Sequence, residues 1–382
     1  MLKDVIINIF GGAICENVNG TKHNKNCLLL YIKFPFLNNT VVDTHQNVRQ
    51  VRVMAEVLNE LEYNVDVCDY YSSKIKLTKT YDMIIDIHVK DNPIYSNNTS
   101  QNTIRIAYFT GSNPIFLNEA ENNRIIDLYS RRGKMLKPRR QVVSFSKNVE
   151  EYEAVFFIGN RYNLLTYKGY NLPDTYLIPN TGYEFNHLSF DSEKDPKSFL
   201  YFGSAGSVHK GLDLLLEVFS QMSNNCELYV CGLYENEKDF CREYSKELYH
   251  SQNIHAMGNV NIWGEVFKEL SEKCAYMILP SCSEGMAGSV VTCMSAGIIP
   301  ICSKYCGYDE EDGVIILPNC SINEIYDTVE KVSQFDQKTI KEMSDKVLKI
   351  SKEKYSLERF RYVMKDSLVR VITKNEKGCN KR

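Results

Sequence analysis

Short runs of β-forming apolar residues alternate with helix-length amphipathic segments along the second half of the chain. Such alternation predicts right-handed βαβ units and a parallel sheet that is covered by helices on both faces. The predicted strands cover 199–203, 227–232, 254–258, 276–281 and 298–303, and the predicted helices cover 212–222, 239–251, 266–274 and 289–297. We therefore expect the second half to form a Rossmann-like domain.

The first half shows the same alternation less regularly. Its candidate strands are 4–10, 27–34, 64–70, 81–88, 103–110, 154–159 and 175–180. Residues 48–63 carry apolar positions at helical spacing, and a second helical pattern over 160–169 ends in Gly169, a candidate C-cap. A polar stretch over 185–198 separates the two halves and predicts a hinge.

These patterns predict an α/β protein of two Rossmann-like domains that face each other across a cleft. A chain of 382 residues exceeds the usual length of one domain. We expect a first domain over 1–190, a second over 191–354, and a terminal helix and tail over 355–382. Because open α/β sheets bind ligands beyond the carboxyl ends of their strands, the functional residues should follow strands or begin helices.

Composition and charge exclude several classes of protein. The 45 basic and 48 acidic side chains give a net charge of −3, which provides no overall attraction to nucleic acid. No apolar run approaches the roughly 18 residues of a membrane-spanning helix, and the N-terminus resembles a strand more than a signal peptide. Most of the 13 cysteines lie within apolar runs, as free thiols do in a reducing compartment. A cytoplasmic protein is expected.

The segment GSAGSVHKGLD at 203–213 joins a predicted strand to a predicted helix. Gly203, Gly206 and Gly211 permit a tight turn whose amides face an anion, and Lys210 adds positive charge beside the helix N-terminus. The spacing differs from that of a Walker loop. A phosphate cradle and a glycine-rich connection with a surface lysine remain equally favoured.

A second candidate segment, PSCSEGMAGSVVTCMSAG at 280–297, follows the predicted strand 276–281. Glu284 lies there in a loop with Gly285 and Gly288, immediately before a helix. A carboxylate in this place accepts hydrogen bonds from ligand hydroxyls, as from a sugar, while neighbouring amides hold phosphates. Considered alone, this glutamate is more often a simple helix cap.

Together with 227–232 and 253–260, these segments resemble the donor-nucleotide half of retaining GT-B glycosyltransferases of family four. The resemblance covers 199–320 and continues more weakly over 81–88 and 151–182; VHKGLD, PSCSEG and VVTCM are most similar to bacterial polysaccharide and O-antigen transferases. It implies a final helix that crosses back to the first domain. It also implies transfer of a hexose, with retention, from a nucleotide diphosphate sugar to a glycan or lipid-linked saccharide, without a cofactor.

The resemblance assigns roles to residues of this chain. Lys210 matches a lysine that contacts the donor diphosphate, and Glu284 matches a glutamate that contacts the transferred sugar. The implied donor-binding set is Gly203, Ser204, Gly206, Lys210, Gly232, Glu284, Gly285, Met286, Ala287, Gly288, Ser289 and Thr292.

Two of these positions depart from the family pattern, which has an arginine at Ser204 and a second glutamate at Thr292. The ribose contact and the nucleotide identity therefore stay open. Arg161 of the first domain is a candidate for the missing charge, although an ordinary surface arginine is the favoured interpretation.

The first domain supplies candidates for the acceptor side. His45 and His88 are candidate acceptor bases or sugar contacts, although structural histidines are favoured. Residues that follow the strand 103–110 are further candidates: Thr110, Gly111, Ser112 and Asn113. The segment RRGKMLKPRR at 131–140 has six basic residues, and contact with anionic lipid headgroups or a pyrophosphate-linked acceptor is as favoured as a solvated loop.

No metal site is expected. Cys302 and Cys306 are a close pair without further ligands, and the acidic run DEED at 309–312 is favoured as a solvated loop. The alternative functions are another GT-B enzyme, such as a nucleotide-sugar epimerase or a glycan phosphorylase, and a sugar-nucleotide-binding partner without catalysis.

Overall fold

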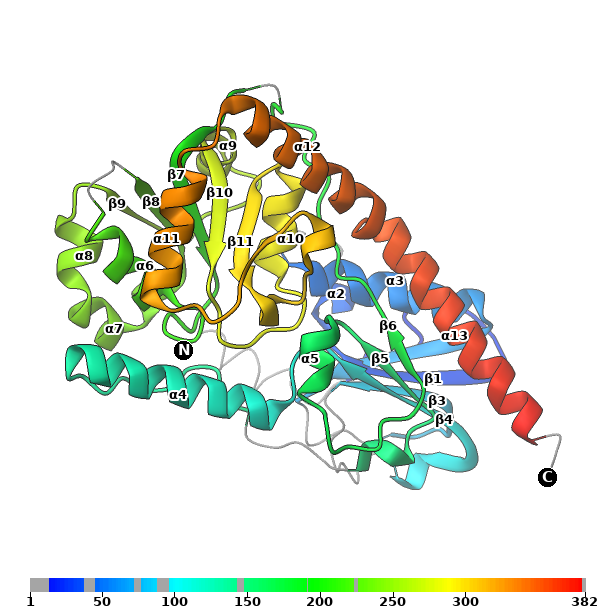
Figure 1. Cartoon of the computed structure of the whole chain (residues 1–382). Coiled ribbons are helices and arrows are strands. Elements are labelled where there is room, and N and C mark those ends of the chain that lie inside the picture. The colour runs from blue at the N-terminus through cyan, green and yellow to red at the C-terminus, as the bar shows by residue number, and fades with distance from the viewer. Residues whose placement is uncertain are drawn as a thin grey trace.

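The computed structural model describes residues 14–37, 45–71, 77–87, 96–142, 148–190, 192–222 and 226–379. Within these ranges the chain forms two domains, each built on its own parallel sheet (Figure 1). The predicted α/β architecture of two Rossmann-like domains is confirmed. The candidate strand 4–10 and His88 lie outside the described residues.

The first sheet has the strand order β2-β1-β3-β4-β5-β6, and every neighbouring pair is parallel. Each strand overlaps a predicted apolar run: β1 (Lys25–Tyr31), β2 (Tyr63–Asp69), β3 (Tyr81–Ile87), β4 (Thr99–Phe109), β5 (Ala154–Phe157) and β6 (Thr175–Leu177). The α-helices described in this half are α2 (Phe34–Leu37), α3 (Gln46–Glu60), α4 (Pro114–Arg132) and α5 (Arg161–Leu165).

The second sheet has the order β12-β11-β10-β7-β8-β9 and is also parallel throughout. Its strands are β7 (Asp195–Gly203), β8 (Glu227–Gly232), β9 (Ile254–Gly258), β10 (Cys274–Leu279), β11 (Ile299–Ser303) and β12 (Ile315–Leu317). The helices that connect them are α6 (Leu212–Phe219), α7 (Lys238–Glu243), α8 (Ser245–His250), α9 (Glu265–Lys273) and α10 (Gly288–Ser295). The direction of winding reverses between β7 and β10, which is the topological switch point of such a sheet.

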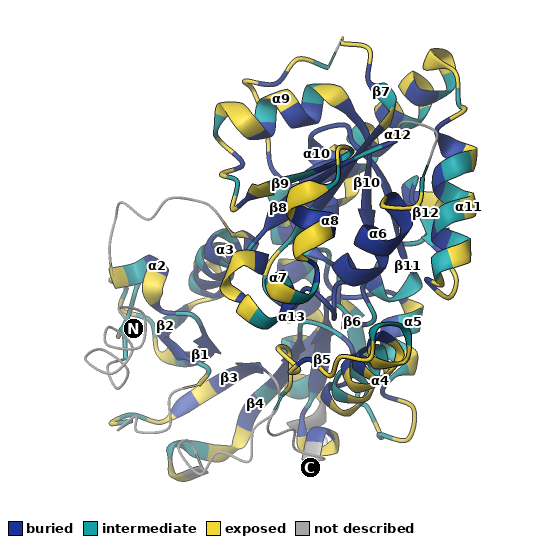
Figure 2. Cartoon of the chain, turned by 90° about the vertical axis from the view of Figure 1, so that its left-hand side faces the viewer, coloured by how far each residue is buried: buried dark blue, intermediate teal, exposed yellow. Residues whose placement is uncertain are grey.

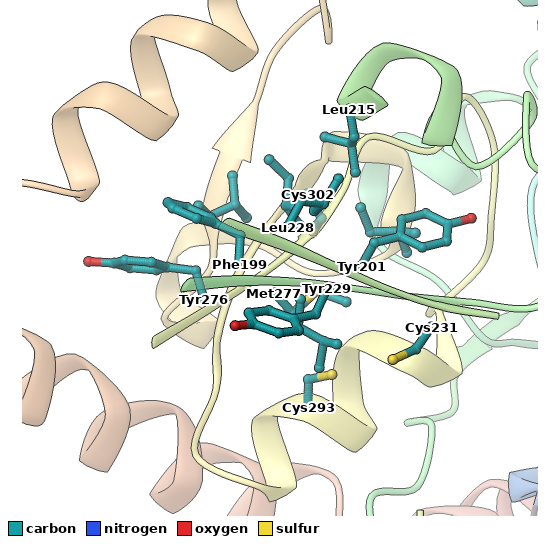
Figure 3. Packing of buried hydrophobic residues seen from close by; sticks show 14 of the residues in the cluster. Phe199, Tyr201, Leu215, Leu228, Tyr229, Cys231, Tyr276, Met277, Cys293 and Cys302 are labelled. Atoms are coloured by element: carbon teal, nitrogen blue, oxygen red, sulfur yellow. The ribbon is translucent and has the colours of Figure 1, made fainter. Parts of the chain in front are cut away.

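The strands of the second sheet are apolar along their whole length because helices cover both faces. All six residues of β10 are buried. Figure 3 shows Leu215 of α6 on one side of the strands and Cys293 of α10 on the other. Phe199 and Tyr276 stack on neighbouring strands with ring centroids 5.2 Å apart. Buried residues colour α6 and the central strands dark blue in Figure 2.

The chain ends in three helices, α11 (Ile322–Val332), α12 (Gln337–Lys354) and α13 (Leu357–Cys379). Figure 1 shows α12 leaving the second domain and α13 lying across the first. Phe360 and Met364 are buried in the hydrophobic core of the first domain, and Arg361 forms an ion pair with Glu56 of α3 at 2.6 Å. The predicted crossing of the final helix is confirmed.

Some elements differ from the sequence prediction. The segment predicted as one helix over 239–251 is divided into α7 and α8 at Tyr244, whose ring is fully buried. The hydrophobic pattern does not predict α4, because only four of its residues are buried and the apolar periodicity is weak. Its local signal is the Asn113 cap followed by Pro114 in the first turn. Among the described helices, none has the length and apolar character needed to cross a bilayer.

We expect Phe360→Ala to lower the free energy of unfolding by about 3–5 kcal/mol, because it opens a cavity where α13 enters the first-domain core. Tyr362 on the same helix is 63% exposed, so Tyr362→Ala should change stability by only about 0.5 kcal/mol. Urea unfolding of both variants measures the difference. A loss of unfolding free energy in Phe360→Ala as small as the one expected for Tyr362→Ala would show that α13 does not stabilise the first domain.

Candidate functional site

Two charged side chains meet at the switch point of the second sheet. Lys210 follows β7 and Glu284 follows β10, the two neighbouring strands between which the winding reverses. The Lys210 ammonium donates a hydrogen bond to Oε1 of Glu284, and their side chains are 6% and 11% exposed. Because the carboxyl ends of parallel strands meet at one sheet edge, residues 74 positions apart form a buried ion pair.

The turn between β7 and α6 directs Lys210 inward. Gly211 begins the helix with φ of 75°, and a Cβ there would lie 2.6 Å from the carbonyl oxygen of Pro280. The Lys210 amide donates to the Gly206 carbonyl at 2.8 Å. The Cys282 amide donates to the His209 carbonyl at 2.9 Å and ties the two loops together. Glycine is thus needed where the chain turns sharply against the neighbouring loop.

The Glu284 carboxylate is ionised at neutral pH. Burial raises its pKa, but the charge of Lys210, then that of His209 in its protonated form at low pH, and then that of Arg140 lower it to about 2. Oε1 also accepts a hydrogen bond from Ser281 Oγ at 3.0 Å. The neighbouring His209 is buried, which lowers its pKa to about 4, and its Nε2 lies 2.5 Å from the Ser283 carbonyl oxygen. At neutral pH the imidazole is therefore uncharged and donates through Nε2.

The loop that carries Glu284 is fixed against the first domain. The Glu284 carbonyl accepts hydrogen bonds from the amide and hydroxyl of Ser112 at 3.0 and 2.8 Å and from Asn163 Nδ2 at 2.9 Å. A Cβ on Gly285 would lie 2.3 Å from the Thr110 carbonyl oxygen. The position of the carboxylate thus depends on both domains. The sequence analysis did not predict that Asn163 would hold the Glu284 loop.

The residues predicted for the acceptor side, Thr110 to Asn113, lie at this contact. Ser112 supports the Glu284 loop, and a Cβ on Gly111 would lie 3.3 Å from the Gly285 nitrogen. Asn113 is buried and caps α4 by accepting from the Ile115 amide at 2.9 Å. The structure thus shows Gly111 and Ser112 against the Glu284 loop, and the acceptor role of these residues stays a prediction.

The anion cradle predicted between β7 and α6 holds a carboxylate of the chain itself. The Gly206 and Ser207 amides donate to Oε1 of Glu237 at 2.7 and 3.1 Å, and Glu237 is buried. These two amides are therefore engaged within the protein. The other predicted amides open α10, whose first turn at Gly288 and Ser289 carries N–H groups without helical partners.

The rest of the donor-binding set lies around these loops. Gly203 and Gly232 end neighbouring strands, and a Cβ on Gly232 would lie 2.5 Å from the Gly203 carbonyl oxygen. Ser204 is exposed at the end of β7. Met286 packs against the cores of both domains, and Ala287 precedes α10 as its N-cap residue.

Thr292 is buried and its hydroxyl is already engaged. It donates to the Gly288 carbonyl at 2.8 Å and accepts from Gln46 Nε2 at 3.0 Å. Gln46 belongs to the first turn of α3 in the first domain. Nothing in the local sequence around Gln46 indicates this contact, since the two residues are 246 positions apart.

His45 caps α3, its Nδ1 accepting from the Asn47 amide at 3.2 Å. The residue reaches solvent, yet desolvation by the surrounding chain and, second, the positive charge of Arg140 lower its pKa. Arg161 is exposed at the start of α5, where its guanidinium lies 4.9 Å from the Tyr162 ring centroid and bonds to the phenol oxygen. The structure therefore shows Arg161 in a surface contact, which is the interpretation favoured from the sequence.

The basic segment 131–140 connects the two domains. Arg131 contacts Asp213 of α6 at 2.6 Å, Arg132 contacts Glu247 of α8 at 2.8 Å, and Arg139 pairs with Asp239 of α7. Half of its six basic side chains therefore neutralise carboxylates of the second domain.

Within the described ranges, no group of three or more histidine, cysteine, aspartate or glutamate side chains is arranged to hold a metal ion. In the acidic run 309–312, Asp309 and Asp312 cap a short 3-10 turn, and Asp312 pairs with Lys354 at 2.8 Å. Cys302 and Cys306 are buried in the core of the second domain.

Residues 184–347 match the family model for glycosyl transferases group 1. The match covers all six strands of the second sheet and the Lys210–Glu284 site. The second domain is thus the part of the chain that is similar to glycosyl transferases group 1. A comparison with curated proteins finds no match.

Solved structures resemble most of this chain. Sucrose-phosphate synthase from Thermosynechococcus elongatus has a TM-score of 0.61 at 12% identity, over 92% of this chain and 100% of that one. Anabaena HepE, described in complex with UDP and glucose, has a TM-score of 0.54 at 10% identity, over 91% and 100%. TarM from S. aureus has a TM-score of 0.53 at 14% identity, over 76% and 54%, so this chain spans about half the length of TarM.

The fold is GT-B. The two Rossmann-like domains and the crossing final helix of this chain are those of the GT-B glycosyltransferases that it resembles. At these identities the likeness establishes the shared fold, and the chemistry is argued from the site.

We expect Lys210→Met to lower the free energy of unfolding at pH 7 by about 3–5 kcal/mol, because it leaves the Glu284 carboxylate buried without its cation. Glu284→Gln in the same chain should recover much of this loss. In wild type the lowered pKa of Glu284 stabilises the fold at pH values above about 4.3, the ordinary pKa of a glutamate. This contribution is lost as the pH falls towards about 2. In Lys210→Met the same pKa is raised above the unfolded value instead.

The stability difference between wild type and Lys210→Met should therefore be largest at pH 7 and shrink as the pH falls towards 4. Urea unfolding across this range measures it. A difference that does not change with pH, or a double variant no more stable than Lys210→Met, would contradict the ion-pair assignment.

Proposed function

We propose that this protein is a retaining glycosyltransferase that moves a hexose from a nucleotide diphosphate sugar to a glycan or lipid-linked saccharide. The observation that carries the proposal is the buried Lys210–Glu284 pair at the switch point, beside the first turn of α10. A lysine, helix amides and an ionised carboxylate in one place suit a ligand that combines phosphates with sugar hydroxyls.

In the free protein the two charges neutralise each other. When donor binds, the ion pair opens and each side chain contacts a different part of the donor. Lys210 and the amides of Gly288 and Ser289 stabilise the negative charge that develops on the departing diphosphate. The Glu284 carboxylate, freed from the lysine, accepts hydrogen bonds from hydroxyls of the sugar. Burial makes both interactions stronger than they would be in water.

Retention of configuration is part of this proposal. The acceptor attacks on the face from which the diphosphate leaves, so no second carboxylate has to act as a nucleophile. The leaving diphosphate then accepts the acceptor's proton. His45 of the first domain, with its lowered pKa, is uncharged at neutral pH and is the described histidine proposed to contact the acceptor.

The donor class agrees with the neighbouring structures. HepE is described in complex with UDP and glucose, and the group 1 match covers the same half of this chain as the proposed donor site. We extend the nucleotide diphosphate to this chain on the basis of Lys210 and the α10 amides.

We expect Lys210→Met and Glu284→Gln each to lower kcat for sugar transfer by about 10²- to 10³-fold, because each removes a group that contacts the donor in the transition state. A thermal-shift panel of nucleoside diphosphates and their sugars first identifies the donor, since a ligand of the folded state raises the melting temperature. Turnover is then measured with that donor, and the product anomer is assigned by NMR.

Arg161→Ala is the matched control, because Arg161 is an exposed cation in a surface contact with Tyr162. It should retain wild-type turnover. Equal turnover in Lys210→Met and wild type would remove the assignment. A product of inverted configuration would refute retention, and an epimerised free sugar or a phosphate requirement would assign the other GT-B activities. Tight nucleotide binding without transfer or hydrolysis would assign the non-catalytic alternative.

We further propose a cytoplasmic location with peripheral contact to an anionic membrane. Within 131–140, Lys134 and Lys137 are exposed and flank Met135, which is 58% exposed. Two cations around an exposed apolar side chain suit a surface of acidic headgroups and acyl chains.

Binding to vesicles of phosphatidylcholine with 30% phosphatidylglycerol, measured by co-sedimentation, should weaken about 30-fold in Lys134→Gln/Lys137→Gln, since each of the two cations near such a surface contributes about 1 kcal/mol. High salt should weaken wild-type binding in the same way. Lys341→Gln/Lys349→Gln, on α12, is a charge-matched control. Unchanged binding in Lys134→Gln/Lys137→Gln would refute the membrane contact.

A further inference from the structure

The positive charge that the second domain offers at the donor site is already matched by negative charge. Lys210 is paired with Glu284, and the Gly206 and Ser207 amides hold Glu237. A nucleotide diphosphate carries at least two negative charges. If it is to bind at this edge of the sheet, a further cation has to approach from elsewhere.

Arg140 of the first domain approaches the same turn. Its side chain passes against Gly206, where an added Cβ would lie 2.7 Å from Arg140 Cγ. Gly206 has φ of 98° and its carbonyl accepts from the Lys210 amide, so Arg140 lies on the turn that presents the lysine. A side chain at Gly206 would displace the arginine, which gives this glycine a second reason besides its backbone angle.

The backbone of Arg140 is firmly held. Its amide donates to both carboxylate oxygens of Glu121, at 3.0 and 3.1 Å, and the Arg139 amide donates to Oε1 at 2.8 Å. Glu121 lies on α4 and is 1% exposed. A buried carboxylate thus fixes the chain where it enters the contact between the domains, while Arg139 is anchored by Asp239.

The Arg140 guanidinium differs from the other arginines of its segment. Arg131, Arg132 and Arg139 pair with carboxylates of the second domain, whereas among the described residues no hydrogen bond or ion pair engages the Arg140 guanidinium. Its side chain is exposed. The positive charge of Arg140 nevertheless acts on the site, because it contributes to the lowered pKa values of Glu284 and His209.

We propose that Arg140 is a donor-binding residue, supplied by the first domain, that binds the diphosphate of the nucleotide sugar together with Lys210. The inference rests on the proposed function and adds to it the residue that provides charge where Ser204 provides none. A guanidinium binds phosphate oxygens through two parallel N–H groups, so it suits this ligand better than a second ammonium. Because Arg140 and Lys210 come from different domains, a bound diphosphate also links the two domains.

The test compares nucleotide binding by the full-length wild type, Arg140→Ala and Lys137→Ala in isothermal titration calorimetry. The probes are uridine, guanosine, adenosine and thymidine diphosphates, followed by the parent nucleoside of the tightest binder. We expect Arg140→Ala to raise the Kd for the diphosphate about 10- to 100-fold, as expected for a lost charge-assisted hydrogen-bond pair. Affinity for the nucleoside should stay within about twofold of wild type, and the salt dependence of diphosphate binding should become weaker.

Lys137→Ala removes an exposed cation three residues away and should bind diphosphate as wild type does. Arg140→Lys keeps the positive charge but lacks the two parallel N–H groups of a guanidinium, so it should recover part of the lost affinity. Diphosphate affinity in Arg140→Ala within twofold of wild type would overturn this inference and leave the proposed function standing. An equal loss for the nucleoside, or an equal loss in Lys137→Ala, would also overturn it. A wild type that binds none of the diphosphates would overturn the proposed function itself.

Discussion

The buried ion pair between Lys210 and Glu284 is the interaction on which the rest of this structure depends. Removing two charges from water costs several kcal/mol, and their attraction recovers that cost only when the geometry is good and further hydrogen bonds are made. Ser281 supplies one such bond to the carboxylate. A pair of apolar side chains would serve stability equally well at this place, so the charges are better explained by a ligand that separates them.

The ion pair in turn depends on how the two domains meet. The Glu284 carbonyl is held by Ser112 and Asn163, and Asn163 Nδ2 also donates to the Tyr305 carbonyl at 3.0 Å. Asn160 makes a similar set of contacts with the loop after β11. Apolar contacts accompany these hydrogen bonds, because Ile125 and Leu128 of α4 belong to the hydrophobic core of the second domain. The proposed donor site is therefore held in place by both domains.

Much of the fold could be predicted from the sequence because it is a local property. Buried parallel strands are short continuous apolar runs, and the predicted strands 227–232 and 254–258 coincide with β8 and β9. The helix α4 could not be predicted in this way, since most of its surface is exposed and its apolar stripe is narrow. The glycine loops, Lys210 and Glu284 could also be predicted from the sequence. Their residue types and their positions directly after strands are features of short consecutive segments.

Sequence alone therefore determined the α/β class, the two-domain order, and the lysine and glutamate expected at the carboxyl edge of the second sheet. Only the tertiary structure decided which charges are available there. It places Glu237 on the amides of Gly206 and Ser207, Gln46 on Thr292, and Arg140 rather than Arg161 against Gly206 in the turn that carries the lysine. The physical reason is that charge compensation and hydrogen bonding act between atoms that are close in space, and these partners lie between 30 and 246 positions apart or on different domains.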